Sequence, residues 1–306
     1  VVKTLVDSNK NIQIVSTGSA SFKISQASKE TLPGRQELYT MLPLKFADSI
    51  KLRRAMGFNE LNAEELKSIG LSLKDGLERA LLTPDSLPQF FDECKKYYLK
   101  NAAQETSVQA ELRAYLAKGG YPEIISTKDA PTCQKLLLGY ANDVIIKDLM
   151  PWFKIRDIET AEKLLFLLAA ISGEKLNIEE ILKRLPGSNK VTIRNYVDYF
   201  KSVDLISTLP VYSGLKMGST KHPKIYFSDV GMKNALAGVL DAPLHETEKG
   251  LLAETTAFDH IKRLAYKLNA ASEGKIFCYC GEKGEVDFIL DLPRQKTKLA
   301  IEVKFR

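Results

Sequence analysis

The sequence predicts a multidomain protein that combines α/β and α+β parts, and three observations support this. The chain has 306 residues, about twice the length of a typical domain. Residues 158–232 place three helical patterns before two strands, and residues 250–306 place one helix before three strands. We therefore expect four consecutive segments, namely 1–47, 48–157, 158–240 and 241–306.

Composition and charge narrow the class of protein. Hydrophobic residues make up 44% and charged residues 27% of the chain, which is ordinary for a globular protein. We find no apolar run of about 18 residues and no start typical of a secretory signal, so we expect a cytoplasmic protein without a membrane partner. The formal net charge of +6 mildly favours a polyanionic partner. The three histidines are too scattered for a zinc site.

The first segment begins with a predicted strand, Ile12 to Val15, which runs into a cluster of Ser, Thr and Gly residues. Exposed backbone N–H groups and hydroxyls after such a strand bind phosphate in α/β folds. Turns of this composition also follow strands that bind nothing, so both interpretations stay open.

The second segment is predicted to be helical over 62–70, 86–100 and 108–125, where apolar residues recur three and four positions apart. The "GGYPE" stretch from Gly119 to Glu123 predicts a helix end. We expect one apolar stripe of the 86–100 helix to face the core, formed by Phe90, Phe91, Cys94, Tyr97 and Tyr98.

The third segment predicts helices over 159–173, 176–187 and 188–206, with Asn177 and Ser188 near two of the helix starts. Strands over 205–214 and 223–231 then flank a basic tip, 215–222. Three helices followed by a hairpin is the order of a winged helix-turn-helix.

The third of these helices is predicted to bury Ile193, Val197 and Phe200. Outward polar side chains can meet phosphates and base edges, whereas Asp198 on the same helix lowers affinity for DNA. DNA binding and a structural or protein-contact role therefore both stay open. The candidate DNA-binding residues are Thr192, Arg194, Asn195, Lys216 and Lys221.

The fourth segment predicts a helix over 250–268 and strands over 275–280, 285–292 and 299–305. Side chains two apart on a strand share a face, so Glu302 and Lys304 should point the same way. Together with Glu254 on the helix and Asp287 on the middle strand, they form a candidate catalytic group.

These residue types suit hydrolysis of a phosphodiester, which uses a cation that prefers carboxylate oxygens. Asp287 and Glu302 would bind Mg²⁺ or Mn²⁺, Lys304 would stabilise charge beside the attacking water, and Glu254 could complete the coordination. The alternative is that these are ordinary outward-facing strand residues. Both carboxylates lie inside apolar runs, where an unpaired charge is costly, and this favours a site.

Several stretches, taken in order, resemble the bacterial and archaeal AAA-type ATPases whose C-terminal half is a domain of unknown function. They are "IVSTGSASF", "LPGRQELYTMLPLKF", "LAKGGYPEII", "IIKDLMPWF", "KIYFSDVGMKNAL", "GLLAET", "EVDFIL" and "IEVK". The resemblance implies the edge of an AAA-type ATPase core with its sensor-1 strand, a helical lid, a winged helix and a PD-(D/E)xK nuclease-like domain, in the four segments above.

The resemblance also implies residue roles. Thr17 would face the nucleotide's γ-phosphate, and Arg35 would contact phosphate in cis, or in trans within a homo-oligomer. Asp287, Glu302 and Lys304 match the D…ExK nuclease signature. However, the chain has no G-x-x-x-x-G-K-[ST] loop, which binds ATP phosphates and Mg²⁺. We therefore expect a fragment that does not hydrolyse ATP alone, although ATP would bind the complete protein.

Three hypotheses for the function follow. The first is an ATP-controlled, metal-dependent DNA nuclease. The second is a nucleotide-dependent switch whose terminal domain is a degenerate nuclease used for binding or assembly. The third is a DNA-binding regulator that acts through the winged helix alone.

Overall fold

The computed structural model describes most of the chain from residue 40 onward. The described residues are 15, 17, 40–59, 61, 73, 75–81, 83–100, 105–153, 155, 157–213, 219–240, 242, 245–268, 275–281, 284–292 and 297–305. The expected helix over 62–70 lies outside these residues, as do Arg35 and Lys216. Of the expected strand at 12–15 only Val15 is described, and it is exposed.

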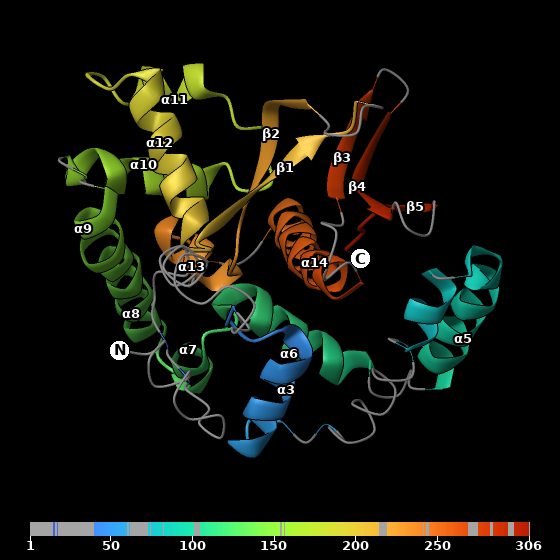
Figure 1. The fold of residues 1–306 in the computed structure, drawn as a ribbon. Helices are drawn as coiled ribbons and strands as arrows, with labels where there is room; N and C mark the ends of the chain where they lie inside the picture. The colour runs from blue at the N-terminus through green and yellow to red at the C-terminus, as the bar shows by residue number, and fades with distance from the viewer. Residues whose placement is uncertain are drawn as a thin grey trace, which may run out of the picture.

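Helices dominate the first half of the described chain (Figure 1). They are α3 (Phe46–Ala55), α5 (Leu87–Lys100) after the 3₁₀ turn η1 (Pro84–Ser86), α6 (Glu105–Lys118), α7 (Pro122–Ser126), and α8 (Ala130–Asp143), which continues through the π-helix η3 (Val144–Leu149) into α9 (Met150–Phe153). The helix end expected at "GGYPE" is confirmed. Gly119 adopts φ +77° after α6, a conformation that glycine tolerates, and Pro122 opens α7.

The apolar stripe expected on α5 is narrower than predicted. Phe90, Cys94 and Tyr97 are half-buried and follow one face of the helix. Phe91 and Tyr98 are 58% and 59% exposed, because each lies one position beyond that face. The expectation that all five residues are core residues was therefore wrong for these two.

The next part contains α10 (Ile158–Ala170), α11 (Ile178–Arg184), α12 (Lys190–Ser202), β1 (Ile206–Val211), β2 (Ser219–Phe227) and α13 (Val230–Leu236). Three helices thus precede a hairpin, as expected. Asn177 caps α11 through a bond from the Glu179 N–H at 3.0 Å. Asn189, and not Ser188, caps α12. The predicted inward residues Ile193, Val197 and Phe200 are buried.

The last part contains α14 (Glu246–Leu268), β3 (Lys275–Gly281), β4 (Gly284–Leu292) and β5 (Thr297–Ile301). All strands join one mixed sheet in the order β2-β1-β3-β4-β5. β1 and β3 are parallel and paired at Val211 and Cys278, whereas the other neighbours are antiparallel. The hairpin of the third segment and the strands of the fourth therefore form a single surface.

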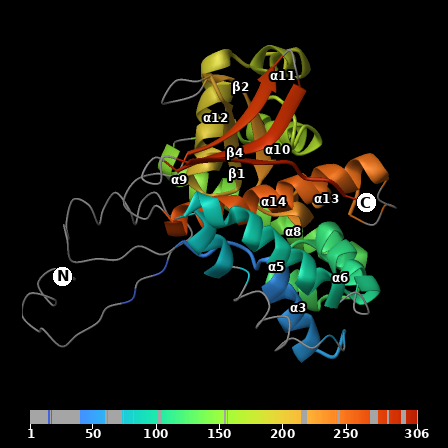
Figure 2. The ribbon, with the colours of Figure 1, turned by 90° about the vertical axis from the view of Figure 1, so that its right-hand side faces the viewer.

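Helix α14 lies between this sheet and α6 in both views (Figures 1 and 2). On its sheet side, Phe258 stacks on Tyr226 with ring centroids 4.6 Å apart. On its other side, Leu252 joins a buried apolar cluster with Tyr115 and Leu116 of α6. Because α14 is covered on both sides, a polar group on its sheet face needs a partner within the protein.

No helix within the described ranges has both the length and the apolar character needed to cross a bilayer.

Candidate functional site

An irregularity in β4 sets the position of Asp287. Phe277 of β3 pairs with Ile289 and Tyr279 pairs with Val286, so Cys278 alone lies opposite both Asp287 and Phe288. Such an insertion is a β-bulge, which breaks the alternation of side chains and redirects one of them. Phe288 packs on Phe258 of α14, and the charge of Asp287 acts on Lys224 and Tyr226. The bulge therefore places Asp287 near groups that face α14.

The ladder between β4 and β5 ends next to Asp287. Its last pair is Phe288 with Ile301, and the expected strand over 299–305 stops there. The Val303 N–H donates instead to Asp287 Oδ2 at 2.8 Å. A side-chain acceptor thus replaces the backbone acceptor that the next ladder position would have supplied.

Glu302 and Lys304 follow the end of β5, and both are exposed. Val303 and Phe305, which alternate with them, pack against apolar clusters. The two candidate residues therefore share one side of the segment, as expected, but they lie outside a strand. Within the described part of the chain, neither side chain has a hydrogen bond or an ion pair.

Glu254 is held by two side chains of β2. Lys224 Nζ and Tyr226 OH donate to Glu254 Oε1 at 2.9 Å and 2.5 Å. Lys224 and Tyr226 are two positions apart on β2 and so face the same way. The side chains of Lys224 and Glu254 are only 13% and 15% exposed. Lys224, Tyr226, Glu254 and Asp287 form a charged centre between β2, α14 and β4, which we call the Lys224 site.

The pKa values within the Lys224 site favour a charged lysine. Burial tends to lower the pKa of Lys224, but the hydrogen bond and charge of Glu254, with the charge of Asp287, raise it overall. The pKa of Tyr226 is raised by burial and by the neighbouring Glu254. Burial also raises the pKa of the Cys278 thiol, to about 11. Lys224 is therefore an ammonium at neutral pH and is the ion-pair partner of Glu254, while Asp287 acts on it only through its charge.

The Lys224 site does not fit a divalent cation as it stands. Across the described ranges, no three His, Cys, Asp or Glu side chains lie close enough to share a metal ion. Glu302 is exposed, and the carboxylate of Glu254 is already paired with the positively charged Lys224. Magnesium needs several oxygen ligands around one point. The structure thus brings Glu254 and Asp287 to one centre without assembling the expected metal ligands.

Sequence reasoning missed Lys224 and Tyr226, although a signal existed. Lys224 lies in "PKIYF", inside an apolar strand, just as Asp287 lies inside "VDFIL". A charged residue in an apolar strand needs a partner of opposite charge. The same argument that singled out Asp287 could therefore have singled out Lys224, but sequence spacing does not show which carboxylate it meets.

The outward face of α12 is the second candidate site, the one considered for DNA binding. Thr192 is half-buried, and Arg194 and Asn195 are exposed. Arg194, Lys190 and Lys201 line a groove of about 560 Å³ against α11 and β2. Lys190 pairs with Glu179 and Lys201 pairs with Asp198, which leaves Arg194 as the cation of these three without an ion-pair partner among the described residues. The side chain of Lys221, at the tip, is not described.

Of the two candidate nucleotide-binding residues, the structure describes only Thr17. Thr17 is exposed, while Arg35 lies outside the described residues.

Comparison with known families finds two matches within the chain. The family described as "AAA domain" matches residues 1–50, and this match indicates a relationship to nucleotide-binding ATPases. The family described as "Domain of unknown function (DUF8612)" matches residues 109–242. The second match begins within α6, extends past α13 and ends before α14, so the Lys224 site contains residues from inside and outside it.

Two archaeal relatives, both from Methanocaldococcus jannaschii, align with nearly the whole chain. The uncharacterized protein MJ1637 is 25% identical over 305 residues, which are 99% of this chain and 58% of that protein. The uncharacterized protein MJ1544 is 25% identical over 293 residues, 94% of this chain and 54% of that protein. The chain therefore spans little more than half the length of these relatives. No solved structure matches.

Proposed function

We propose that this chain works in a nucleotide-dependent switch of the AAA type, in which the α14–β5 region binds or assembles and does not cleave DNA. The match of residues 1–50 to an AAA domain supports the nucleotide-dependent part. One observation carries the rest: Lys224 Nζ lies 2.9 Å from Oε1 of Glu254, the carboxylate that was expected to complete the metal coordination.

The argument is one of charge. Two carboxylates facing a largely buried space need positive charge nearby, and a nuclease supplies it with metal ions. Here the ammonium of Lys224 supplies it, and the Tyr226 hydroxyl and the Val303 N–H occupy one oxygen of each carboxylate. A cation entering this site would have to displace a charge-assisted hydrogen bond.

Removing the ammonium tests this role directly. Thermal unfolding of the wild-type chain should not respond to Mn²⁺ at low millimolar concentration. Lys224→Met should be less stable and should gain a Mn²⁺-dependent rise in Tm, because Glu254 then lacks its ion-pair partner near the charge of Asp287. Glu254→Gln in the Lys224→Met background should abolish the gain. Lys224→Arg, which keeps the charge, is the matched control and should not respond to Mn²⁺.

A rise in wild-type Tm with Mn²⁺ that Asp287→Asn removes would contradict the proposal and favour the second candidate, a metal-dependent nuclease. One observation supports that candidate: the bulge brings Asp287 next to the 302–304 segment, with Val303 bonded to it. Linear, nicked and four-way-junction DNA should be tested with Mn²⁺, with and without ATP. Cleavage that Asp287→Asn abolishes would establish the nuclease.

DNA contact through α12 is a separate proposal, supported by Arg194, which lines the groove, is exposed and has no ion-pair partner among the described residues. It is compatible with either function of the Lys224 site.

A further inference from the structure

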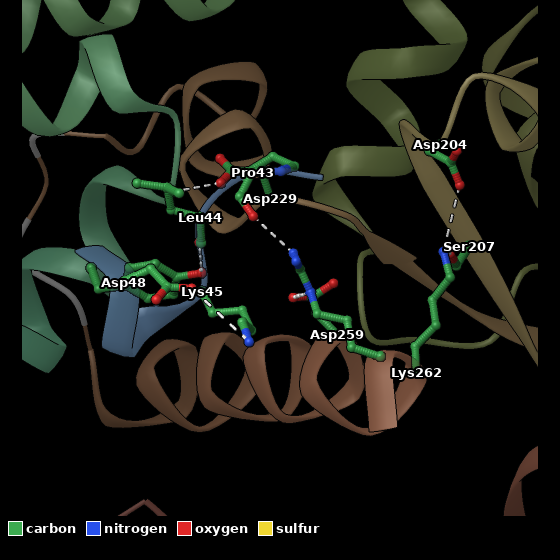
Figure 3. Close-up of polar contacts among 12 residues, drawn as sticks. Pro43, Leu44, Lys45, Asp48, Asp204, Ser207, Asp229, Asp259 and Lys262 are labelled. Atoms are coloured by element: carbon green, nitrogen blue, oxygen red, sulfur yellow. Dashed lines mark hydrogen bonds and ion pairs between the residues drawn. The ribbon is translucent and has the colours of Figure 1, made fainter. Parts of the chain in front are cut away.

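The described end of the AAA-matched region is fastened to the centre of the molecule. We call Pro43, Leu44, Lys45 and Phe46 the strap. The Leu44 N–H donates to the Gly120 carbonyl at 2.8 Å, and the Tyr115 hydroxyl donates to the Leu44 carbonyl at 2.9 Å. Arg263 of α14 donates from Nη2 to the Pro43 carbonyl at 2.8 Å. Figure 3 shows the first three strap residues beside α14, near Asp229 and Asp259.

The surface under the strap is closely packed. A Cβ atom on Gly120 would lie 2.1 Å from the Leu44 carbonyl oxygen, so only glycine allows this approach. The Gly120 N–H in turn donates to Asp229 Oδ2 at 2.7 Å, and Asp229 is 5% exposed. Asp229 also caps α13 through the Met232 N–H at 2.8 Å. The strap thus rests on a rigid junction between α6 and α13.

The last strap residue reaches the same apolar cluster as the end of the described chain. Phe46 packs edge-on against Tyr115, with ring centroids 5.6 Å apart. Phe46 and Phe305 both pack against the buried cluster formed by Tyr115, Leu116, Val230 and Leu252. Phe305 directly follows Lys304. The exposed Glu302 and Lys304 are therefore positioned by Val303, bonded to Asp287, and by Phe305 in the cluster of the strap.

Helix α14 connects these points. Arg263 binds the strap and is itself oriented by Asp259, with Nε and Oδ2 2.7 Å apart. Leu252 belongs to the cluster, and Glu254, two residues later, binds Lys224 and Tyr226. A packed helix moves as a unit, because close-packed interiors transmit displacement. Undocking of the strap would thus shift α14 and change the contacts of Phe305 and of Glu254 in the Lys224 site.

We propose that docking of the strap on the cluster shared with Phe305 sets the position of the 302–304 segment, so that the AAA region controls the terminal site through this junction. The inference rests on the proposed function only in taking the nucleotide state of the AAA region as the source of the signal. Two ends of the described chain share one cluster, and removal of either aromatic ring should loosen the other end, since coupling between two sites is reciprocal.

Hydrogen–deuterium exchange on the whole 306-residue chain, without nucleotide, tests the coupling. In Phe46→Ala, exchange of the Val303 amide, which donates to Asp287, should rise about tenfold, because this hydrogen bond opens locally more often. In Phe305→Ala, exchange at the Leu44 amide should rise by a similar factor. Phe91→Ala, which removes an exposed ring of α5, is the matched control and should change neither.

The amides of α10 report global stability and should keep their protection in each variant. If Phe46→Ala lowers protection everywhere, Phe46→Leu is used in its place, and a smaller but still selective effect is expected at the Val303 amide. Unchanged exchange at the Val303 amide in a variant whose Leu44 amide exchanges faster would overturn the proposal, as would an effect in one direction only. Failure here leaves the Mn²⁺ response of Lys224→Met untouched, so the two proposals fail separately.

Discussion

The Lys224 site and the outward face of α12 carry similar residue types in different surroundings. In the Lys224 site, Lys224 and Glu254 are largely buried and bonded to each other, with Tyr226 beneath them. On α12, Lys201 and Asp198 are 40% and 67% exposed in their ion pair, and Arg194 is exposed without one among the described residues. Burial makes the first group important for stability, while exposure makes the second available to a partner.

The largest effect is expected from breaking the buried pair. Lys224→Met leaves Glu254, whose side chain is 15% exposed, without its ion-pair partner. We expect the free energy of unfolding to fall by about 3 kcal/mol, as for the loss of one partner of a buried ion pair. Urea denaturation measures it. Lys163→Met, which breaks an exposed pair with Glu159, should leave the denaturation midpoint unchanged, and an equal loss in both variants would contradict the comparison.

A smaller loss is expected when only the hydroxyl is removed. Tyr226→Phe keeps the ring that stacks on Phe258 but deletes the donor to Glu254. Hydrogen bonds to charged groups contribute about 2 kcal/mol, so the same denaturation experiment should show a loss of that order. Tyr199→Phe provides a control, since it alters a half-buried ring of α12. If Tyr226→Phe costs nothing, the hydroxyl does not hold Glu254.

Alkaline pH should gradually reduce the contribution of the Lys224 site to the free energy of unfolding. The folded-state pKa of both Lys224 and Tyr226 is raised above the ordinary values of 10.5 and 10.0. A raised pKa stabilises the fold below the unfolded-state pKa, and this contribution is lost as pH rises through the folded-state pKa. The free energy of unfolding should therefore decline above about pH 10. Tyr226→Phe should show a shallower decline, and an unaltered slope would count against this assignment.

The smallest structural effect is expected on α12. Arg194→Ala should not change the denaturation midpoint, because the side chain is exposed and unpaired among the described residues. If α12 contacts DNA, the variant should bind more weakly, and the slope of log affinity against log salt should shrink by about one. Asn195→Ala, on the neighbouring position, should leave that slope as it is. An unchanged slope in Arg194→Ala would place the DNA elsewhere.

Local patterns predicted much of the secondary structure. Apolar spacing located α10, α12 and α14, and the Asn177 cap was identified because a side-chain oxygen there accepts from an N–H two residues later. The predicted start near Ser188 was one position early, since Asn189 performs the same capping role. Such features involve residues within one helical turn of each other, so they can be recognised from a short stretch of sequence.

The candidate site depended on longer-range features. Asp287 and Glu302 were singled out because a carboxylate inside an apolar run needs a partner, but Glu302 is exposed. The bulge opposite Cys278 and the end of β5 at Ile301 were not predicted, because strand register depends on neighbouring strands that sequence spacing does not place. The exposure of Phe91 and Tyr98 on α5 was missed for a similar reason. Periodicity identifies the apolar side of a helix, but it does not show how much of that side other elements cover.

The sequence by itself determined where most of the described helices and strands form, that Asp287 inside the apolar run of β4 needs a partner, and the order of segments that resembles AAA-type ATPases. Only the tertiary structure decided that the partner of Glu254 is Lys224, 30 residues away in the chain, and that Phe46 and Phe305 meet one cluster. The physical reason is distance along the chain. Hydrogen bonding within a turn follows from adjacent residues, whereas charge compensation and packing depend on which elements the whole fold brings together.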